Sequence, residues 1–300
     1  MADTGTVVPV DRAAFERLLG EMRPKLHRYC ARMTGSVIDG EDITQDALMK
    51  AVAAYTGSEG MGNIEAWLFR IAHNTALDFL RRRARQNAIH VDKDDMEMIA
   101  DPVSVTDDRQ AVAASLRTLM RLPVTQRSSV ILMDVLGYTI QEITSITETT
   151  VPAVKAALHR GRTRLGELVR EPEDQAPPTL DAAEQARLAD YIDRFNARDF
   201  DALRAMLADE VKLDLVNRTR LNGRSEVSNY FSRYSQALDW QLFPGLVDGR
   251  PAILVYDPDD SSHRPKYFML LEWTTDRVLA IRDFRYARYA VEGAAFIRLR

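Results

Sequence analysis

The chain has very little cysteine and no long apolar segment. A single cysteine, Cys30, excludes an internal disulfide. Leu26 and Met33 lie near it at helical spacing, which indicates a packing role for the thiol. No uninterrupted apolar run approaches the ~20 residues that a membrane helix needs, and residues 1–10 lack the basic start and apolar core of a secretory signal. We therefore expect a cytoplasmic protein that makes no contact with a membrane.

Signals for metals and cofactors are also scarce. Five scattered histidines and one cysteine make no ligand set, and no glycine-rich loop of the phosphate-binding kind occurs. We expect neither a metal nor a cofactor. The composition, with 46% hydrophobic and 28% charged residues, is that of a soluble globular protein, and a length of 300 residues favours two or three domains over one.

Charge is unevenly distributed along the chain, although the formal net charge is only -4. Residues 66–90 carry five arginines and one acid, and residues 150–170 carry five basic residues and one acid. Between them, residues 92–108 carry seven acids and one lysine. Two basic helices separated by an acidic tether are typical of two DNA-contacting modules joined by a linker that must not bind DNA.

The first block, residues 11–86, is predicted to be a small all-helical bundle. Its apolar residues recur at intervals of three and four. The run Asp39 to Asp42 has the acid-first spacing of a helix N-terminus. Residues 56–63 are predicted to form a loop, and residues 87–108 form the acidic linker.

The second block, residues 109–170, is also predicted to be all-α. An apolar helix is interrupted at Leu122-Pro123 and followed by two short helices, 140–146 and 151–165. Joined across residues 147–150, they form a helix-turn-helix whose second helix would lie in the major groove.

A Pro-rich acidic linker, residues 171–180, precedes a third block of different character. Residues 181–300 open with two amphipathic helices, 183–195 and 200–207, and continue with strand-like segments. Strands are expected at residues 211–216, 251–256, 266–273, 278–284 and 295–299. Helices followed by a mostly antiparallel sheet predict an α+β domain.

The most specific stretch of sequence runs from Trp67 to Arg83. On a helix, its apolar residues fall on one face and a basic, hydrogen-bonding stripe falls along another. The stripe consists of Arg70, Asn74, Asp78, Arg81, Arg82 and Arg85. Arginine neutralises phosphates and asparagine offers a paired donor and acceptor to a base edge, so the stripe predicts DNA contact. The plainer alternative is a solvated helix end whose arginines complement the helix dipole.

Together with Asp39-Gly-Glu-Asp-Ile-Thr-Gln-Asp46, this stretch resembles region two of the extracytoplasmic-function sigma factors, with the patterns D-x-E-D-x-x-Q-E/D and W-L-x-x-I-A-x-N-x-x-x-D-x-x-R-R. The resemblance implies that the acidic helix docks on the clamp helices of the RNA polymerase β′ subunit. The implied polymerase contacts are Asp39, Glu41, Asp42, Gln45 and Asp46. The later helix and its preceding loop would open the downstream promoter element and capture its melted strand. The implied DNA contacts there are Ser58, Asn63, Arg70, Asn74, Arg81, Arg82 and Arg85.

The second block resembles region four of the same family. The segment Leu122-Pro-Val-Thr-Gln-Arg127 matches the family pattern L-P-x-x-Q-R, and Gly137-Tyr-Thr-Ile-Gln-Glu-Ile143 matches G-Y-S-x-x-E-I. The segment from Val151 through Arg162 is similar to the pattern x-G-T-V-K-S-R-L-x-R-A-R. The resemblance implies docking on the polymerase β flap and binding of duplex promoter DNA. The implied DNA contacts are Lys155, His159, Arg160, Arg162 and Arg164. The family's Ser-Arg pair is Ala156-Ala157 here, which predicts an upstream element that is bound weakly or has an unusual sequence.

The third block resembles the SnoaL-like, or nuclear-transport-factor-two-like, domains in its opening, Tyr191 to Val211. The resemblance implies two helices feeding a curved sheet that forms a cone around a pocket, and some sigma factors of the family use such a domain to regulate themselves. Related isomerases and cyclases place acid and base side chains in the cone. The pocket candidates here are Asp214, Tyr256 and Asp283, which could equally be hydrogen-bonded structure. An unknown small ligand in this domain is left open.

These observations predict a three-domain transcription initiation factor that performs no catalytic step. It would hold core RNA polymerase with the acidic helix and promoter DNA with two separate modules. Two alternatives stay open. A helix-turn-helix regulator without sigma activity would bind duplex DNA without polymerase and would not need the acidic helix. A SnoaL-like isomerase or cyclase fused to a DNA-binding module would need an open pocket with a paired acid and base.

Overall fold

The computed structural model describes residues 12–55, 63–87, 114–171, 180–236 and 240–299. The chain falls into two compact units, residues 1–173 and 174–300. Some sequence predictions lie outside the described residues: residues 56–62 of the predicted loop, which include Ser58, residues 88–108 of the acidic linker and residues 172–179 of the Pro-rich linker. Within the described ranges, no helix is both long enough and apolar enough to cross a membrane.

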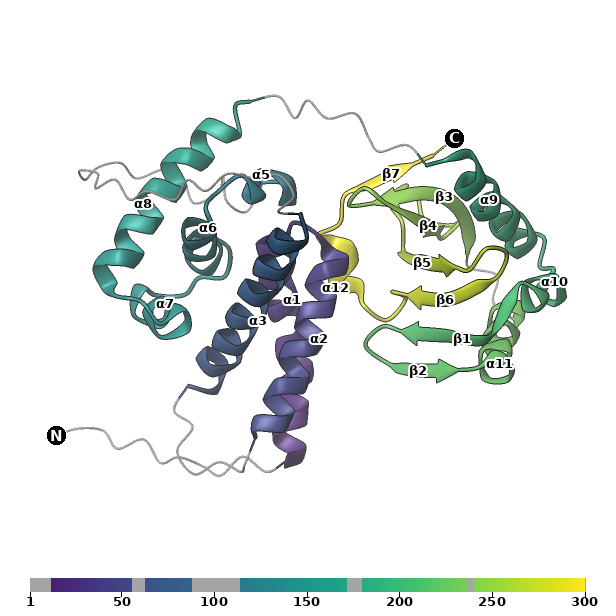
Figure 1. The fold of residues 1–300 in the computed structure, drawn as a ribbon, viewed down its shortest axis with the longest axis horizontal. Helices are drawn as coiled ribbons and strands as arrows, with labels where there is room; N and C mark the ends of the chain where they lie inside the picture. The colour runs from purple at the N-terminus through teal and green to yellow at the C-terminus, as the bar shows by residue number, and fades with distance from the viewer. Residues whose placement is uncertain (1–11, 56–62, 88–113, 172–179, 237–239, 300) are drawn as a thin grey trace. The chain divides into compact units, whose positions relative to one another are not determined.

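The first unit begins with three long helices, α1 Arg12–Thr34, α2 Val37–Ala54 and α3 Ile64–Asn87 (Figure 1). Ser36 caps α2, because its Oγ accepts hydrogen bonds from the backbone N–H groups of Ile38 and Asp39 at 3.2 and 3.3 Å. The helix therefore starts before the acidic run, which occupies its first turns rather than its cap. α1 and α2 cross closely at Gly40, where an added Cβ would lie 2.6 Å from the backbone of Ala31.

The rest of the first unit contains the helix-turn-helix. Its elements are α5 Leu116–Met120, α6 Val124–Val130, a π-helical turn η1 Ile131–Val135, α7 Ile140–Thr147 and α8 Val151–Leu168. Thr139 and Glu142 form a capping box at the start of α7. Glu148 adopts the left-handed conformation (φ 54°) that ends α7, and Thr150 caps α8. The predicted helix-turn-helix is confirmed, within three residues at the end of α8.

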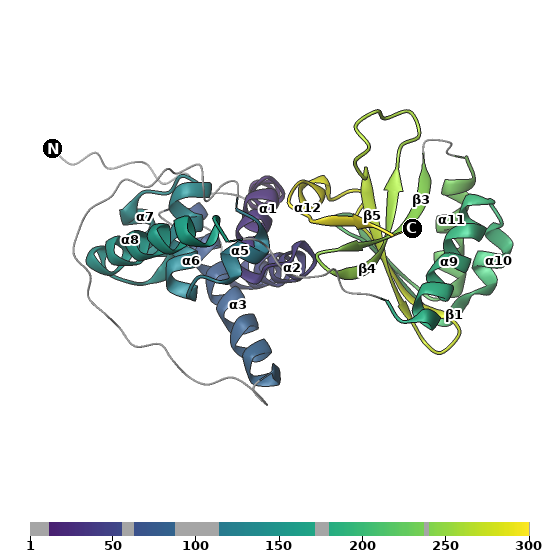
Figure 2. The same ribbon diagram turned by 90° about the horizontal axis from the view of Figure 1, so that it is seen from above.

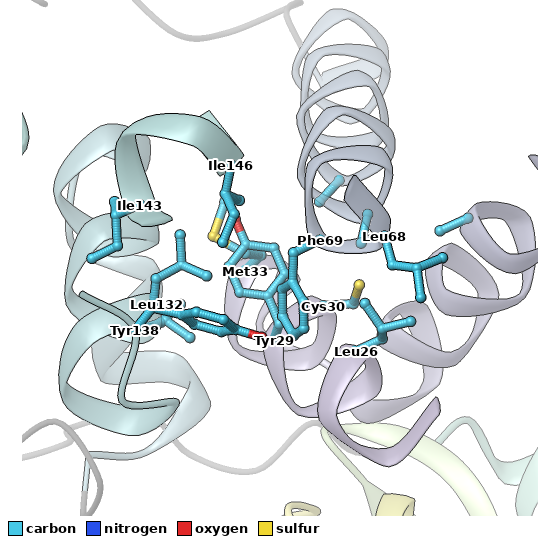
Figure 3. Close-up of a cluster of buried hydrophobic side chains, with 14 of the residues drawn as sticks. Leu26, Tyr29, Cys30, Met33, Leu68, Phe69, Leu132, Tyr138, Ile143 and Ile146 are labelled. Carbon is cyan, nitrogen blue, oxygen red and sulfur yellow. The ribbon is translucent and has the colours of Figure 1, made fainter. Parts of the chain in front are cut away.

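A single hydrophobic core joins the two halves of this unit. Figure 3 shows Tyr29 of α1 and Phe69 of α3 packed beside Tyr138 and Ile143 from the second half. The Phe69 and Tyr138 rings meet edge to face with centroids 5.0 Å apart. The division of residues 11–86 and 109–170 into separate domains stays a prediction; in this structure their helices share one core.

Polar contacts also cross between the two halves. The buried Arg127, the last residue of the L-P-x-x-Q-R motif, donates from Nη1 to the backbone oxygen of Met33 at 2.9 Å. Glu65 of α3 accepts from the Tyr138 hydroxyl and pairs with Lys25 of α1. The two halves are therefore fixed to each other by directional bonds as well as by apolar packing.

The second unit is an α+β domain, as predicted. Two helices, α9 Ala182–Asn196 and α10 Phe200–Ala205, lead into a seven-stranded sheet of order β2-β1-β6-β5-β4-β3-β7. The strands are β1 Leu207–Leu215, β2 Thr219–Asn222, β3 Gln241–Val247, β4 Arg250–Tyr256, β5 Tyr267–Trp273, β6 Val278–Asp283 and β7 Phe296–Arg298. Only β1 and β6 pair in parallel among the described strands.

Helices cover one face of this sheet. Figure 2 shows α9, α10 and α11 (Arg224–Gln236) grouped on the same side, and α12 (Arg288–Glu292) separate from them. The core beneath them is aromatic: Phe195 of α9 meets Tyr234 and Trp240 edge to face, with both pairs of centroids 5.1 Å apart. The side chains on this face of the sheet are thus enclosed by protein.

Several sequence predictions for this unit need correction. The second helix ends at Ala205 rather than residue 207, because Leu207 already begins β1. Strands β2 and β3 and helices α11 and α12 were not expected. β3 was missed because Pro244 and Gly245 interrupt its strand-like sequence pattern. α11 was missed because it is rich in Ser, Asn and Tyr, which are weak helix formers.

Candidate functional site

The acidic residues of α2 divide into a buried pair and an exposed pair. Asp39 and Glu41 are buried. Asp39 Oδ2 lies 3.3 Å from Arg83 Nη1, which ties α2 to α3. Glu41 pairs with Arg23, whose Nη2 also donates to Gln45 Oε1 at 2.8 Å, which ties α2 to α1. Removing one partner from such a buried pair leaves an uncompensated charge, so these acids support the bundle.

The other two acids lie on the surface of α2. Asp42 and Asp46 are exposed and four residues apart, so they share one face of the helix. One turn later, Met49 and Val52 continue this face with side chains that are 58% and 41% exposed. We call Asp42, Gln45, Asp46, Met49 and Val52 the α2 stripe. It presents carboxylates beside an exposed apolar end, which fits a protein partner better than DNA.

The basic stripe of α3 lies on one face of the helix, and several of its members make local contacts. Asn74, Arg81, Arg82 and Arg85 are exposed. Arg81 pairs with Asp78 at 3.1 Å, and the other two arginines donate to backbone oxygens one turn earlier at 3.3–3.4 Å. These bonds are single and solvent-exposed, so they are weak enough to be exchanged for phosphates.

Two predicted DNA contacts of this region have structural partners. Asn63 Oδ1 accepts from the Ala66 backbone N–H at 3.0 Å and so caps α3. Arg70 lies 3.6 Å from Glu148, in the turn of the helix-turn-helix. The turn between α7 and α8 therefore meets the basic stripe of α3.

The cations of α8 also fall into two groups. Arg162 forms an ion pair with Asp134 of η1, with Nε 3.0 Å from Oδ2, and the Asp134 side chain is only 1% exposed. Arg164 pairs with Glu167 at 2.7 Å. Lys155 is exposed and Arg160 is half-buried, and neither has an acidic partner among the residues that the structure describes. Sequence reasoning grouped all of these as DNA contacts, whereas the structure places Arg162 in an internal ion pair.

A groove of about 480 Å³ runs beside α8. It is lined by Arg121, Pro123, Gln126, His159, Arg160, Thr163, Arg164 and Glu167. Arg121 is paired with Glu171, so Arg160 is the cation of this groove without an acidic partner among the described residues. The groove adjoins His159 and Arg160 of the predicted DNA contacts and widens that surface toward α6.

In the second unit, Asp283 is the centre of a buried polar cluster. Its Oδ2 accepts from the hydroxyls of Tyr230 and Tyr234 at 2.8 and 3.0 Å, and its Oδ1 accepts from the Arg285 backbone N–H at 2.8 Å. Burial raises the pKa of Asp283, and burial together with this carboxylate raises the pKa of both tyrosines. The two oxygens of Asp283 thus hold α11 and the chain after β6 in place.

The sequence did not reveal this tyrosine cluster. Tyr234 also shares a hydrogen bond of 2.9 Å with Tyr267 of β5. Tyr230 and Tyr234 are four residues apart, so they lie on one face of α11, and only the recognition of α11 as a helix could have placed them together. Among the described residues, no group of three His, Cys, Asp or Glu side chains could hold a metal ion.

The three pocket candidates do not converge. Asp214 pairs in register with Arg282, whereas Asp283 pairs with Leu215, so the two aspartates point to opposite faces of the sheet. Asp214 instead lies 3.4 Å from Arg220 and 3.6 Å from Arg282. Val255 pairs in register with Tyr267 and lies on the same face of the sheet as Asp283. Tyr256 is the next residue, so its ring lies on the opposite face, where it packs against Phe243.

Two protein families and several known proteins are similar to this chain. The family Sigma-70 region 2 matches residues 18–86, and the family Sigma-70, region 4 matches residues 114–165. Over the C-terminal part, the structure is similar to an NTF-2 like protein of unknown function from Burkholderia xenovorans LB400, at 16% identity and a TM-score of 0.27, covering 33% of this chain and 79% of that chain.

Similar sequences cover more of the chain. The ECF RNA polymerase sigma factor SigG of Mycobacterium tuberculosis is 28% identical over 316 aligned positions, which cover 95% of this chain and 85% of SigG. The ECF RNA polymerase sigma factor SigM of the same organism is 31% identical over 159 positions, which cover 53% of this chain and 79% of SigM. With region two and region four present in this order, the chain belongs to the extracytoplasmic-function family of RNA polymerase sigma factors.

Proposed function

We propose that this chain binds core RNA polymerase through the α2 stripe and directs it to promoters through α3 and α8. The observation that carries the proposal is the division of the motif acids. Asp39 and Glu41 are paired inside the bundle, while Asp42 and Asp46 stand on the surface beside exposed apolar side chains. Exposed carboxylates next to exposed apolar side chains form a surface that suits a protein partner.

The promoter contacts are divided between the two modules. Asn74, Arg81, Arg82 and Arg85 on α3 face the melted downstream element, where arginines hold phosphates and Asn74 reaches a base edge. Lys155, His159 and Arg160 on α8 face the duplex upstream element. The clamp helices of β′ would hold the α2 stripe and the β flap would hold region four. The protein would accordingly act in the cytoplasm, where polymerase and promoters are.

Replacement of the exposed acids tests this proposal. The double substitution Asp42→Ala with Asp46→Ala should weaken binding of purified core polymerase at least tenfold, because it removes two charges from a small interface. The matched control is Glu16→Ala with Glu21→Ala, which removes two exposed carboxylates from α1 and should leave binding unchanged. Circular dichroism should show the same helix content in both variants. Equal core binding by both variants would contradict the assignment of the stripe.

The second unit would modulate this activity. It is a compact unit of its own, and the best supported role of its buried Asp283 cluster is structural, because both carboxylate oxygens already accept hydrogen bonds from the protein. We place no catalytic step in it. Deletion of the residues after Leu180 should change the yield of transcripts, and an unchanged yield together with unchanged polymerase binding would remove the regulatory role.

A further inference from the structure

The first turn of α8 exposes apolar side chains where a DNA-reading helix commonly carries polar ones. Val151, Pro152 and Ala153 are all exposed, and Val151 is 37% exposed. Exposed apolar groups gain nothing from water, so an exposed apolar turn on a predicted contact surface points to an apolar partner.

The buried face of α8 fixes which side chains point outward. Val154, Leu158 and Leu165 pack into the core. With about 100° between successive residues, the opposite side carries Pro152, Ala156 and His159. Val151 lies beside this line at the exposed start of the helix, one turn before Lys155. Ala157, the second residue of the pair that replaces the family's Ser-Arg, is buried, whereas Ala156 is half-exposed on the outer side.

Cations flank this outward line. Lys155 lies on one side of it and Arg160 on the other, and neither has an acidic partner within the described part of the chain. A helix with an apolar first turn and a cation on each flank complements a major groove, whose floor carries base edges and whose two walls are phosphate backbones.

The first turn of α8 offers no side-chain hydrogen bond to a base, because Val151, Pro152 and Ala153 are apolar and His159 lies two turns further along the helix. Arg162, one of the predicted DNA contacts, is held by Asp134. The apolar feature that a base presents in the major groove is the 5-methyl group of thymine, which apolar side chains contact. The chemistry of the first turn therefore matches thymine rather than a guanine or adenine hydrogen-bonding edge.

We propose that α8 selects its upstream promoter element through thymine 5-methyl groups, which pack against Val151, Pro152 and Ala156 while Lys155 and Arg160 hold the two backbones. The inference rests on the proposed function, because it assumes that α8 enters promoter DNA. It assigns a specificity role to the alanine that replaces the polar residue of the family pattern.

The test uses the full chain bound to core polymerase and a promoter selected from a library by run-off transcription. Each thymine of the upstream element, on either strand, is replaced singly by uracil, which removes the methyl group and keeps every hydrogen-bonding group. Binding is measured by fluorescence anisotropy. We expect one or two positions at which uracil weakens binding about three- to fivefold, the size expected for one buried methyl group.

A variant connects the effect to α8. Val151→Ala should weaken binding to the thymine promoter and reduce the effect of uracil at one of those positions to less than about twofold, because the methyl group has lost its contact. Val169→Ala is the control, since Val169 is also exposed but lies beyond the end of α8; it should retain the full uracil effect.

Two results would overturn the inference. One is a promoter that binds well although no single uracil replacement changes affinity, and the other is an uracil effect that is the same in the Val151→Ala variant. If no promoter is bound at all, the proposed function fails first, and this outcome is distinguishable because core polymerase binding is measured separately.

Discussion

Asp39 and Asp42 are three residues apart in one motif, and the structure gives them different surroundings. Asp39 is buried against Arg83, and Asp42 is exposed on the α2 stripe. Arg160 and Arg162 differ in the same way, since Asp134 holds only the second of them. Identity within a motif therefore does not decide whether a charge faces a partner or supports the fold, because that depends on what the neighbouring helix places opposite it.

Buried His73 makes the stability of the first unit depend on pH. Its Nδ1 lies 2.6 Å from the Tyr29 hydroxyl, and burial lowers its pKa to about 4. The unfolded chain binds a proton near pH 6.5, so stability is complete above that pH and falls as the pH drops toward 4. The contribution of His73 should fall by about 2 kcal/mol between pH 7.5 and pH 5.

Urea unfolding at the two pH values measures this loss. His73→Gln keeps a hydrogen-bond acceptor for Tyr29 but cannot take up the proton, so its stability should fall about 2 kcal/mol less than that of the natural chain. Equal pH dependence in both proteins would show that His73 is not the responsible group.

Along the element α8, Arg162 is held in an internal ion pair, whereas we expect Lys155 and Arg160 to contact phosphates. Lys155→Ala and Arg160→Ala should each reduce the slope of log K against log salt by about 0.9. Arg162→Ala should leave that slope unchanged and lower the free energy of unfolding by about 2 kcal/mol, because it leaves the buried Asp134 carboxylate unpaired. Salt titrations of promoter binding and urea unfolding, made on the same three variants, check both statements. A lower salt slope in Arg162→Ala would contradict the internal assignment of this arginine.

The same elements show what the sequence could predict. The periodic helices and the helix-turn-helix were found within a few residues, because apolar spacing and capping residues are local signals. β3 was missed because it contains Pro244 and Gly245, and α11 because its composition is polar. The separation of Asp39 from Asp42 and the capture of Arg162 could not be predicted, since each depends on a partner more than 25 residues away in the chain.

At the scale of the molecule, regions two and four share a core that includes Phe69 and Leu132. A chain ending at residue 173, the boundary of the first unit, retains one tryptophan, Trp67. Trp67 belongs to region two and packs near Phe15. Its fluorescence therefore reports the unfolding of region two alone.

Leu132 lies in region four and is fully buried. Leu132→Ala should therefore lower the free energy of unfolding of this shorter chain by about 2–5 kcal/mol. If the core is shared, the Trp67 transition in urea should shift by the same amount as the helix signal in circular dichroism. An unchanged Trp67 midpoint would show that the two regions unfold independently.

As a whole molecule, the chain is a sigma factor, and we propose that its first unit joins polymerase to promoters. The most direct measurement is run-off transcription with purified core RNA polymerase on a promoter library, with the full chain and with a chain ending at Leu180. We expect transcripts from one defined class of promoters, in amounts that differ between the two chains. Binding of duplex DNA without polymerase, and no transcripts from either chain, would contradict it and would favour a helix-turn-helix regulator.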